Sequence, residues 1–139
     1  MKVVAFKTDF RDESSSPPAP PPGETLAQTV RNDAHAHGCE CDEVDLHEEF
    51  GWAWVQKAGG TSFYVLLTQH AGLPDQWLIQ IEAQRRLPFL LRPKHPKAEF
   101  DTCRQIHSSL MSHPNVSAIR WFDSLEEVRK SADEGRPEP

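Results

Sequence analysis

The sequence predicts an α+β fold with a mostly antiparallel sheet, whose two longer helices pack on one face. Three consecutive runs rich in aromatic and β-branched residues, WAWVQ, TSFYVLLTQ and QWLIQIEAQ, are separated only by short turns, which is typical of an antiparallel meander. The segments on either side of the meander repeat apolar residues at steps of three and four, which is the period of a helix. The predicted element order is β-α-β-β-β-β-α-β-α.

The first quarter of the chain is predicted to hold a strand, an exposed loop and a helix. The apolar run VVAF indicates a strand over residues 2–8. A proline-rich loop at 14–23 follows, exposed because proline donates no backbone hydrogen bond and favours an extended conformation. The pattern TLAQ from Thr25 is typical of a capping box, and apolar residues then recur at helical spacing up to Gly38.

The middle of the chain is predicted to be strands. Residues 39–46 should run extended, although many acidic side chains make this strand weak. The three meander strands follow near 52–56, 61–69 and 76–84, with glycine-containing turns between them. Strict alternation puts Trp52 and Trp54 on one face of the sheet and the side chains between and after them on the other.

The last third of the chain is predicted to hold a helix, a strand and a short helix. Three prolines make residues 85–97 irregular, and the next helix ends near His113. Residues 116–122 read as a strand, and a capping box at Ser124 opens a short helix. We expect a single domain over 1–131 and a flexible tail over 132–139. The apolar face of the longer helix is predicted to hold Phe100, Cys103, Ile106 and Leu110.

Composition limits the classes of partner. The chain has 139 residues, a net charge of -6 and a pI near 5.6, which argues against a nucleic-acid partner because phosphate binding requires clustered Lys and Arg. No stretch is long and apolar enough to act as a signal peptide or to span a membrane. The three cysteines favour reduced thiols over a disulfide scaffold, so a cytoplasmic location is expected.

The stretch HAHGCEC, positions 35–41, raises the question of a metal site. His35, His37, Cys39 and Cys41 carry the ligand types that zinc prefers. In a helix the two histidines project about 200° apart, and in an extended chain the four side chains span too far for one ion. We therefore predict no metal and no cofactor, and keep a site of His37, Cys39 and Cys41 as the alternative.

No catalytic residues are predicted. Cys103 and His107 are four residues apart on one helix, within contact range. A nucleophile and its base are usually brought together from distant segments, and a cysteine among apolar residues behaves as a small buried side chain. We interpret this pair as packing, and a small enzyme with a site assembled from distant residues remains the alternative.

Charge is unevenly distributed. Residues 40–49 carry six acids and no Lys or Arg, whereas residues 85–97 carry five bases and no acid. The two runs could neutralise each other, or the acidic one could attract a basic protein partner while aromatic side chains supply contact area. The predicted interaction surface comprises Asp42, Glu43, Asp45, Glu48, Glu49, Trp52 and Trp54.

Size, acidity, an aromatic-rich meander and the lack of a catalytic motif point to a binding protein. In these features the chain resembles small bacterial proteins of the kind that includes toxin-neutralising immunity proteins. This resemblance implies a cytoplasmic, non-enzymatic interaction module with an inhibitory role. A homodimer contact through the second face of the sheet is an alternative use of its apolar groups.

Overall fold

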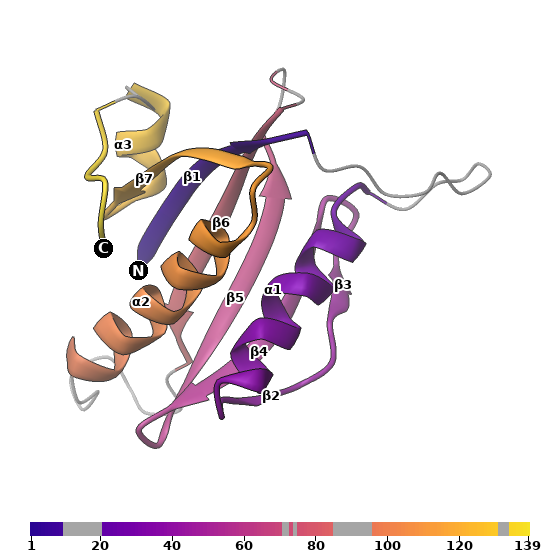
Figure 1. Cartoon of the computed structure of the whole chain (residues 1–139), viewed down its shortest axis with the longest axis vertical. Helices are drawn as coiled ribbons and strands as arrows, with labels where there is room; N and C mark the ends of the chain where they lie inside the picture. The colour runs from indigo at the N-terminus through magenta and orange to yellow at the C-terminus, as the bar shows by residue number, and fades with distance from the viewer. Residues whose placement is uncertain (10–20, 71–72, 74, 85–95, 131–133) are drawn as a thin grey trace.

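The computed structural model (Figure 1) describes residues 1–9, 21–70, 73, 75–84, 96–130 and 134–139. It confirms the α+β class and the predicted order of elements, with one difference: the weak strand expected at 39–46 is divided into two short strands. The elements are β1 (Lys2–Thr8), α1 (Glu24–Ala36), β2 (Glu40–Cys41), β3 (Asp45–His47), β4 (Gly51–Ala58), β5 (Thr61–Gln69), β6 (Gln76–Ala83), α2 (Pro96–Ser112), β7 (Val116–Phe122) and α3 (Leu125–Lys130).

Two predicted irregular segments fall largely outside the described residues. Of the proline-rich loop at 14–23, only Pro21, Pro22 and Gly23 are described, and of the basic run at 85–97, only Pro96 and Lys97. Residues 132 and 133 of the predicted tail are also outside.

Within the described residues, seven strands form one antiparallel sheet in the order β2-β4-β5-β6-β1-β7, with β3 also paired to β4. The meander β4-β5-β6 is as predicted. Strand β1 lies between β6 and β7, so that Val4 is opposite both Ile79 and Trp121. Helix α1 lies beside β2 and β4, at the edge of the sheet where β2 and β3 follow it in the chain (Figure 1).

Helices α1 and α2 cover one face of the sheet and contact each other (Figure 1). The main core lies between these helices and the sheet, and it includes Trp54, Phe63 and Trp121. Removing the apolar surface of such large side chains from water is the main stabilising contribution to the fold. The apolar face of α2 differs slightly from the prediction, because Phe100 is exposed while Ala98 and Thr102 are buried.

The other face of the sheet is covered in part by α3. A smaller apolar cluster joins Val3, Ala5, Leu78, Phe122 and Val128, with Val128 contributed by α3. The predicted capping box at the start of α3 is present in modified form. The amide of Glu127 donates to Ser124 Oγ at 3.3 Å, and the Glu127 carboxylate accepts from the amide of Asp123 rather than from that of Ser124.

Helix α1 starts two positions earlier than predicted. Its N-cap is Gly23, at φ 112°, and Thr25 lies within the first turn, so the predicted capping box is wrong. A Cβ at Gly23 would lie 2.8 Å from Cζ3 of Trp77. Contact with this buried ring therefore determines where the helix begins, and a pattern in the local sequence could not show it.

A β-bulge interrupts the pairing of β1 and β7. Ala5 is opposite Arg120 and Lys7 is opposite Ser117, so two residues of β7, Ala118 and Ile119, face one residue of β1. Ala118 takes up the extra length in a left-handed conformation, φ 53°, which glycine adopts more readily.

Candidate functional site

The acidic side chains predicted to form an interaction surface lie together at one edge of the sheet. Strands β2 and β3 and the turns beside them carry these carboxylates, and all of them are exposed. Arg31 of α1 fixes the backbone here by donating to the carbonyl oxygens of Cys41 and Asp42, at 2.9 and 3.0 Å. The six acids are Glu40, Asp42, Glu43, Asp45, Glu48 and Glu49.

The carboxylates are only weakly neutralised by their neighbours. Glu40 approaches Lys57 at 3.5 Å and Glu43 approaches Arg31 at 3.7 Å, and these exposed pairs are worth little in water. Among the described residues, the other four acids form no ion pair in the structure. The edge therefore keeps most of its negative charge available to an approaching cation.

Apolar and aromatic side chains accompany these acids. Phe50 is 51% exposed and Leu46 is 43% exposed. The His47 ring packs edge-on against Phe50 and its Nδ1 is hydrogen-bonded to the Tyr64 hydroxyl. Burial, together with the carboxylates of Asp45 and Glu48, raises the pKa of the Tyr64 phenol. We call the six acids together with Leu46, His47, Phe50 and Tyr64 the acidic–aromatic surface.

Trp52 and Trp54 do not belong to this surface, in contrast to the prediction. They point towards α1 and α2, where both are buried in the main core. The Trp52 indole donates to the carbonyl oxygen of Pro21 at 2.9 Å, and that of Trp54 donates to the Gln56 side chain at 3.2 Å. Alternation correctly placed the two rings on one face, but the sequence does not say which face the helices cover. The aromatic residues that do belong to the surface were not predicted from the sequence. Phe50 directly follows the acidic run, and Tyr64 lies on β5.

The residues of the alternative metal site are each engaged elsewhere. His37 Nδ1 is hydrogen-bonded to the carbonyl oxygen of Asp33 at 2.7 Å, at the end of α1. The Cys41 thiol donates to the carbonyl oxygen of Cys39, and Cys39 Sγ accepts from the Gln56 amide. Burial raises the pKa of both thiols, that of Cys41 to about 11, which disfavours the thiolate that a metal needs.

His35 is exposed on α1. Across the described ranges, no group of three or more His, Cys, Asp or Glu side chains has the arrangement of a metal site.

Cys103 and His107 do not form a nucleophile–base pair. Cys103 is 2% exposed in the core, and burial raises its pKa to about 12. His107 Nδ1 instead accepts a hydrogen bond from the Trp121 indole at 3.0 Å. Burial therefore favours the protonated thiol, and the imidazole serves as the acceptor for a buried donor.

A Ser-Asp-His cluster not identified from the sequence joins α1 to α2. The Ser109 hydroxyl donates to Asp33 Oδ2, and His113 Nε2 is hydrogen-bonded to the same oxygen at 3.0 Å. In a catalytic triad the histidine lies between the serine and the acid, whereas here the acid lies between the other two. The cluster is therefore arranged to fasten the two helices rather than to activate the hydroxyl.

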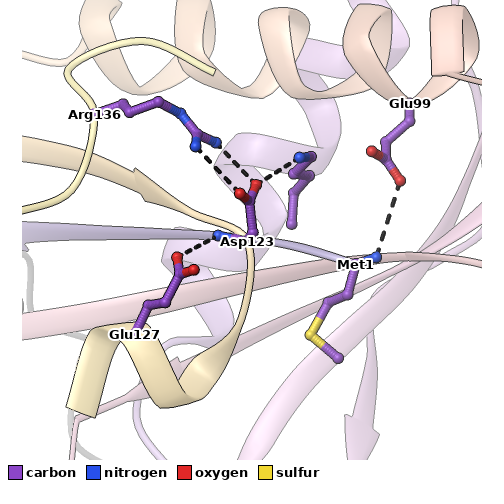
Figure 2. A network of polar contacts seen from close by, with 6 residues as sticks. Met1, Glu99, Asp123, Glu127 and Arg136 are labelled. Atoms are coloured by element: carbon purple, nitrogen blue, oxygen red, sulfur yellow. Dashed lines mark hydrogen bonds and ion pairs between the residues drawn. The ribbon is translucent and has the colours of Figure 1, made fainter. Parts of the chain in front are cut away.

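A polar network lies at the other end of the sheet (Figure 2). Asp123 accepts from Lys2 Nζ at 2.6 Å and from Arg136, and the Met1 amine approaches Glu99 at 4.0 Å. Beside it is a pocket of about 370 Å³. The residues around the pocket are Lys2, Pro96, Glu99, Phe100, Cys103, Asp123, Arg136 and Pro139.

Comparisons with protein-family models, with curated proteins and with solved structures found no match to this chain. In the part of the chain that the structure describes, none of the helices is long and apolar enough to cross a membrane. The geometry of the surfaces is therefore the basis for the functional conclusion.

Proposed function

We propose that this protein is a non-enzymatic interaction module that binds a basic protein partner through the acidic–aromatic surface. The observation that carries the proposal is the placement of six exposed acids beside exposed Phe50 and Leu46 at one edge of the sheet. Exposed charges mainly accelerate encounter, and buried apolar contacts mainly slow dissociation. A surface that combines both types of group is suited to a lasting complex with a cationic partner.

The framework beneath the surface supports this proposal. Arg31 holds the backbone of β2 from α1, and the His47–Tyr64 hydrogen bond links β3 to the sheet. A surface on a fixed framework loses little conformational entropy on binding. The strands themselves are short and carry charge, which protects an edge against unselective strand pairing, so recognition here depends on side chains.

The role that we propose is inhibitory, in the manner of the immunity proteins that the chain resembles in size and acidity. An acidic surface that covers a basic functional site on its partner would block that site. The location that we propose is the cytoplasm, since the three cysteines are free thiols in the structure and a reducing compartment keeps them so.

The experiment compares two full-length triple variants with the wild type. In the first, Asp42→Asn, Glu43→Gln and Asp45→Asn remove charge from the acidic–aromatic surface. In the matched control, Asp75→Asn, Asp101→Asn and Glu126→Gln remove the same charge elsewhere. Partners captured from extracts of the source organism are identified, and association and dissociation rates are then measured at several salt concentrations.

The surface variant should associate with the captured partner about tenfold more slowly at low salt and with a weaker salt dependence, because steering by several charges changes association rates by this order. The control variant should behave like the wild type. Phe50→Ala should mainly accelerate dissociation. Equal association rates and equal salt dependence in the two triple variants would refute the proposed surface.

A further inference from the structure

Residues 134–139, which we call the strap, lie along the outer edge of β7. The amide of Trp121 donates to the carbonyl oxygen of Arg136 at 2.7 Å, and the amide of Arg136 donates to the carbonyl oxygen of Trp121 at 3.0 Å. Together these bonds make an antiparallel bridge. The sequence led us to expect a flexible tail here. In the structure Arg136 forms a single bridge to the edge of β7 that does not pair with β1.

The side chain of Arg136 forms a bidentate ion pair with Asp123 (Figure 2). Its two terminal nitrogens lie 3.0 and 3.3 Å from the two carboxylate oxygens. Lys2 contacts the same carboxylate, and the amide of Asp123 is held by Glu127. A carboxylate that is fixed in this way matches the planar fork of a guanidinium better than it matches an ammonium group.

The pairing of Arg136 with Asp123 also requires a glycine at the preceding position, Gly135. A Cβ at this position would lie 2.5 Å from Cζ of Phe122 and 2.8 Å from Cβ of Arg120. Both neighbours belong to β7, so the edge itself limits what can precede the arginine. Only a residue without a side chain fits against the Phe122 ring while the next residue pairs with Asp123.

The strap also forms part of the pocket described above. Arg136 and Pro139 contribute one side of it, and Phe100 and Glu99 of α2 contribute another. The strap therefore closes one side of a cavity of about 370 Å³, and a partner segment in the same place would line that cavity in its turn.

We propose that the outer edge of β7, with Asp123 and Phe122, is a binding site for an extended segment of a partner protein that contains the dipeptide Gly-Arg, and that the strap occupies this site in the unbound chain. Main-chain pairing at the sheet edge supplies the alignment, as in other cases of strand addition. The guanidinium pair and the close contact at Phe122 supply the selectivity. This site lies at the opposite edge of the sheet from the acidic–aromatic surface, so the two proposals are independent.

The strap is suited to exchange with a partner segment. Arg136 and Asp123 are each 49% exposed, and the bridge to Trp121 is isolated. Segments held by few, exposed contacts open more readily than the core. A partner segment with the same dipeptide would remake the contacts that the strap gives up.

The test is a titration of ¹⁵N-labelled full-length chains with the free peptide Glu-Gly-Arg-Pro-Glu-Pro, followed by NMR at the Trp121 backbone amide. In the Gly135→Ala chain the strap should be displaced by its new Cβ, which leaves the site open. We expect saturable shifts in this variant and binding about tenfold weaker in the wild type, because a tethered strap competes at an effective concentration in the millimolar range. Arg136→Ala provides a second open chain, which loses the guanidinium pair instead.

Two controls test the selectivity. The peptide Glu-Ala-Arg-Pro-Glu-Pro should not bind, because its Ala side chain meets Phe122. The double variant Asp123→Asn with Gly135→Ala should lose most of the response while it keeps the circular dichroism spectrum of the folded protein. The proposal is overturned by the absence of binding to both folded open chains, by equal binding of the two peptides, by insensitivity to Asp123→Asn, or by equal binding to the wild type and the open chains.

Discussion

Replacing Ala118 with glycine should stabilise the protein, although most substitutions destabilise. Ala118 sits in the bulge of β7 at φ 53°, and its side chain is exposed, so little packing is lost with the methyl group. The left-handed conformation costs an L-residue about 1–2 kcal/mol, and glycine adopts it freely. Glycine also gains about 0.4–1 kcal/mol of flexibility in the unfolded chain, which opposes the effect. The net expectation is a gain of about 0.5–1 kcal/mol.

The reverse exchange at Gly23 is the matched comparison. Alanine there would be held at φ 112° with its Cβ 2.8 Å from the Trp77 ring. Backbone strain of about 1–3 kcal/mol and overpacking of about 1–3 kcal/mol add, so we expect a loss of about 2–6 kcal/mol. The same pair of residue types thus gives opposite signs at two positions, for a reason that lies in the backbone.

Urea denaturation followed by tryptophan fluorescence and by circular dichroism measures both variants. In thermal unfolding, a change of 1 kcal/mol corresponds to about 3–4 °C for a domain of this size, so Ala118→Gly should raise the midpoint by about 2–4 °C. Ala118→Val, whose branched side chain tolerates a positive φ least, should lower the midpoint. A lower midpoint for Ala118→Gly than for the wild type would refute the assignment of strain to this bulge.

Two further predictions concern titratable groups in and beside the main core. Burial, assisted by Arg104 and opposed by Glu138, lowers the pKa of His107 in the folded protein. The neutral imidazole therefore contributes its full stabilisation of the folded state above the unfolded pKa of about 6.5, and this contribution is lost as the pH falls below that value. His107→Gln, which keeps an acceptor for the Trp121 indole, should therefore reduce the difference in urea midpoint between pH 7.5 and pH 5.5; an unchanged difference would contradict the sign. The Cys103 thiol, with a pKa of about 12 and 2% exposure, should resist a thiol reagent at pH 8 until the chain unfolds. Cys103→Ser should therefore leave the number of thiols that react in the native protein unchanged, whereas three equally fast thiols in the wild type would show that the core opens readily.

The sequence predicted the elements well where the hydrophobic period was long and regular. The meander and the helix through Ile106 and Leu110 are examples, because burial of one face requires a regular repeat. The start of α1 was missed because the requirement for glycine at position 23 comes from its contact with Trp77, a residue more than fifty positions away. Local patterns describe what a segment favours, and contacts across the fold decide among the options.

Only the acidic part of the candidate surface could be predicted from the sequence. The six acids could be identified because a charge run is visible along the chain. Trp52 and Trp54 were assigned to the surface because alternation gives two faces without saying which one the helices cover. The pairing of Asp123 with Lys2 and Arg136 joins three segments, and no signal in the sequence indicates it.

The position of β1 inside the sheet has a consequence for synthesis of the chain on the ribosome. Its partner Ile79 in β6 is made long after Val4, and its partner Trp121 in β7 is made later still. At about 5–20 residues per second, roughly 6–24 s separate the synthesis of Val4 from that of Trp121. Until β6 is made, the apolar run VVAF has neither neighbour, and until β7 is made, one edge of β1 stays unpaired. Docking of β1 is therefore a late step of folding, and a nascent chain that stalls before β7 presents this strand to chaperones or to other unfinished chains.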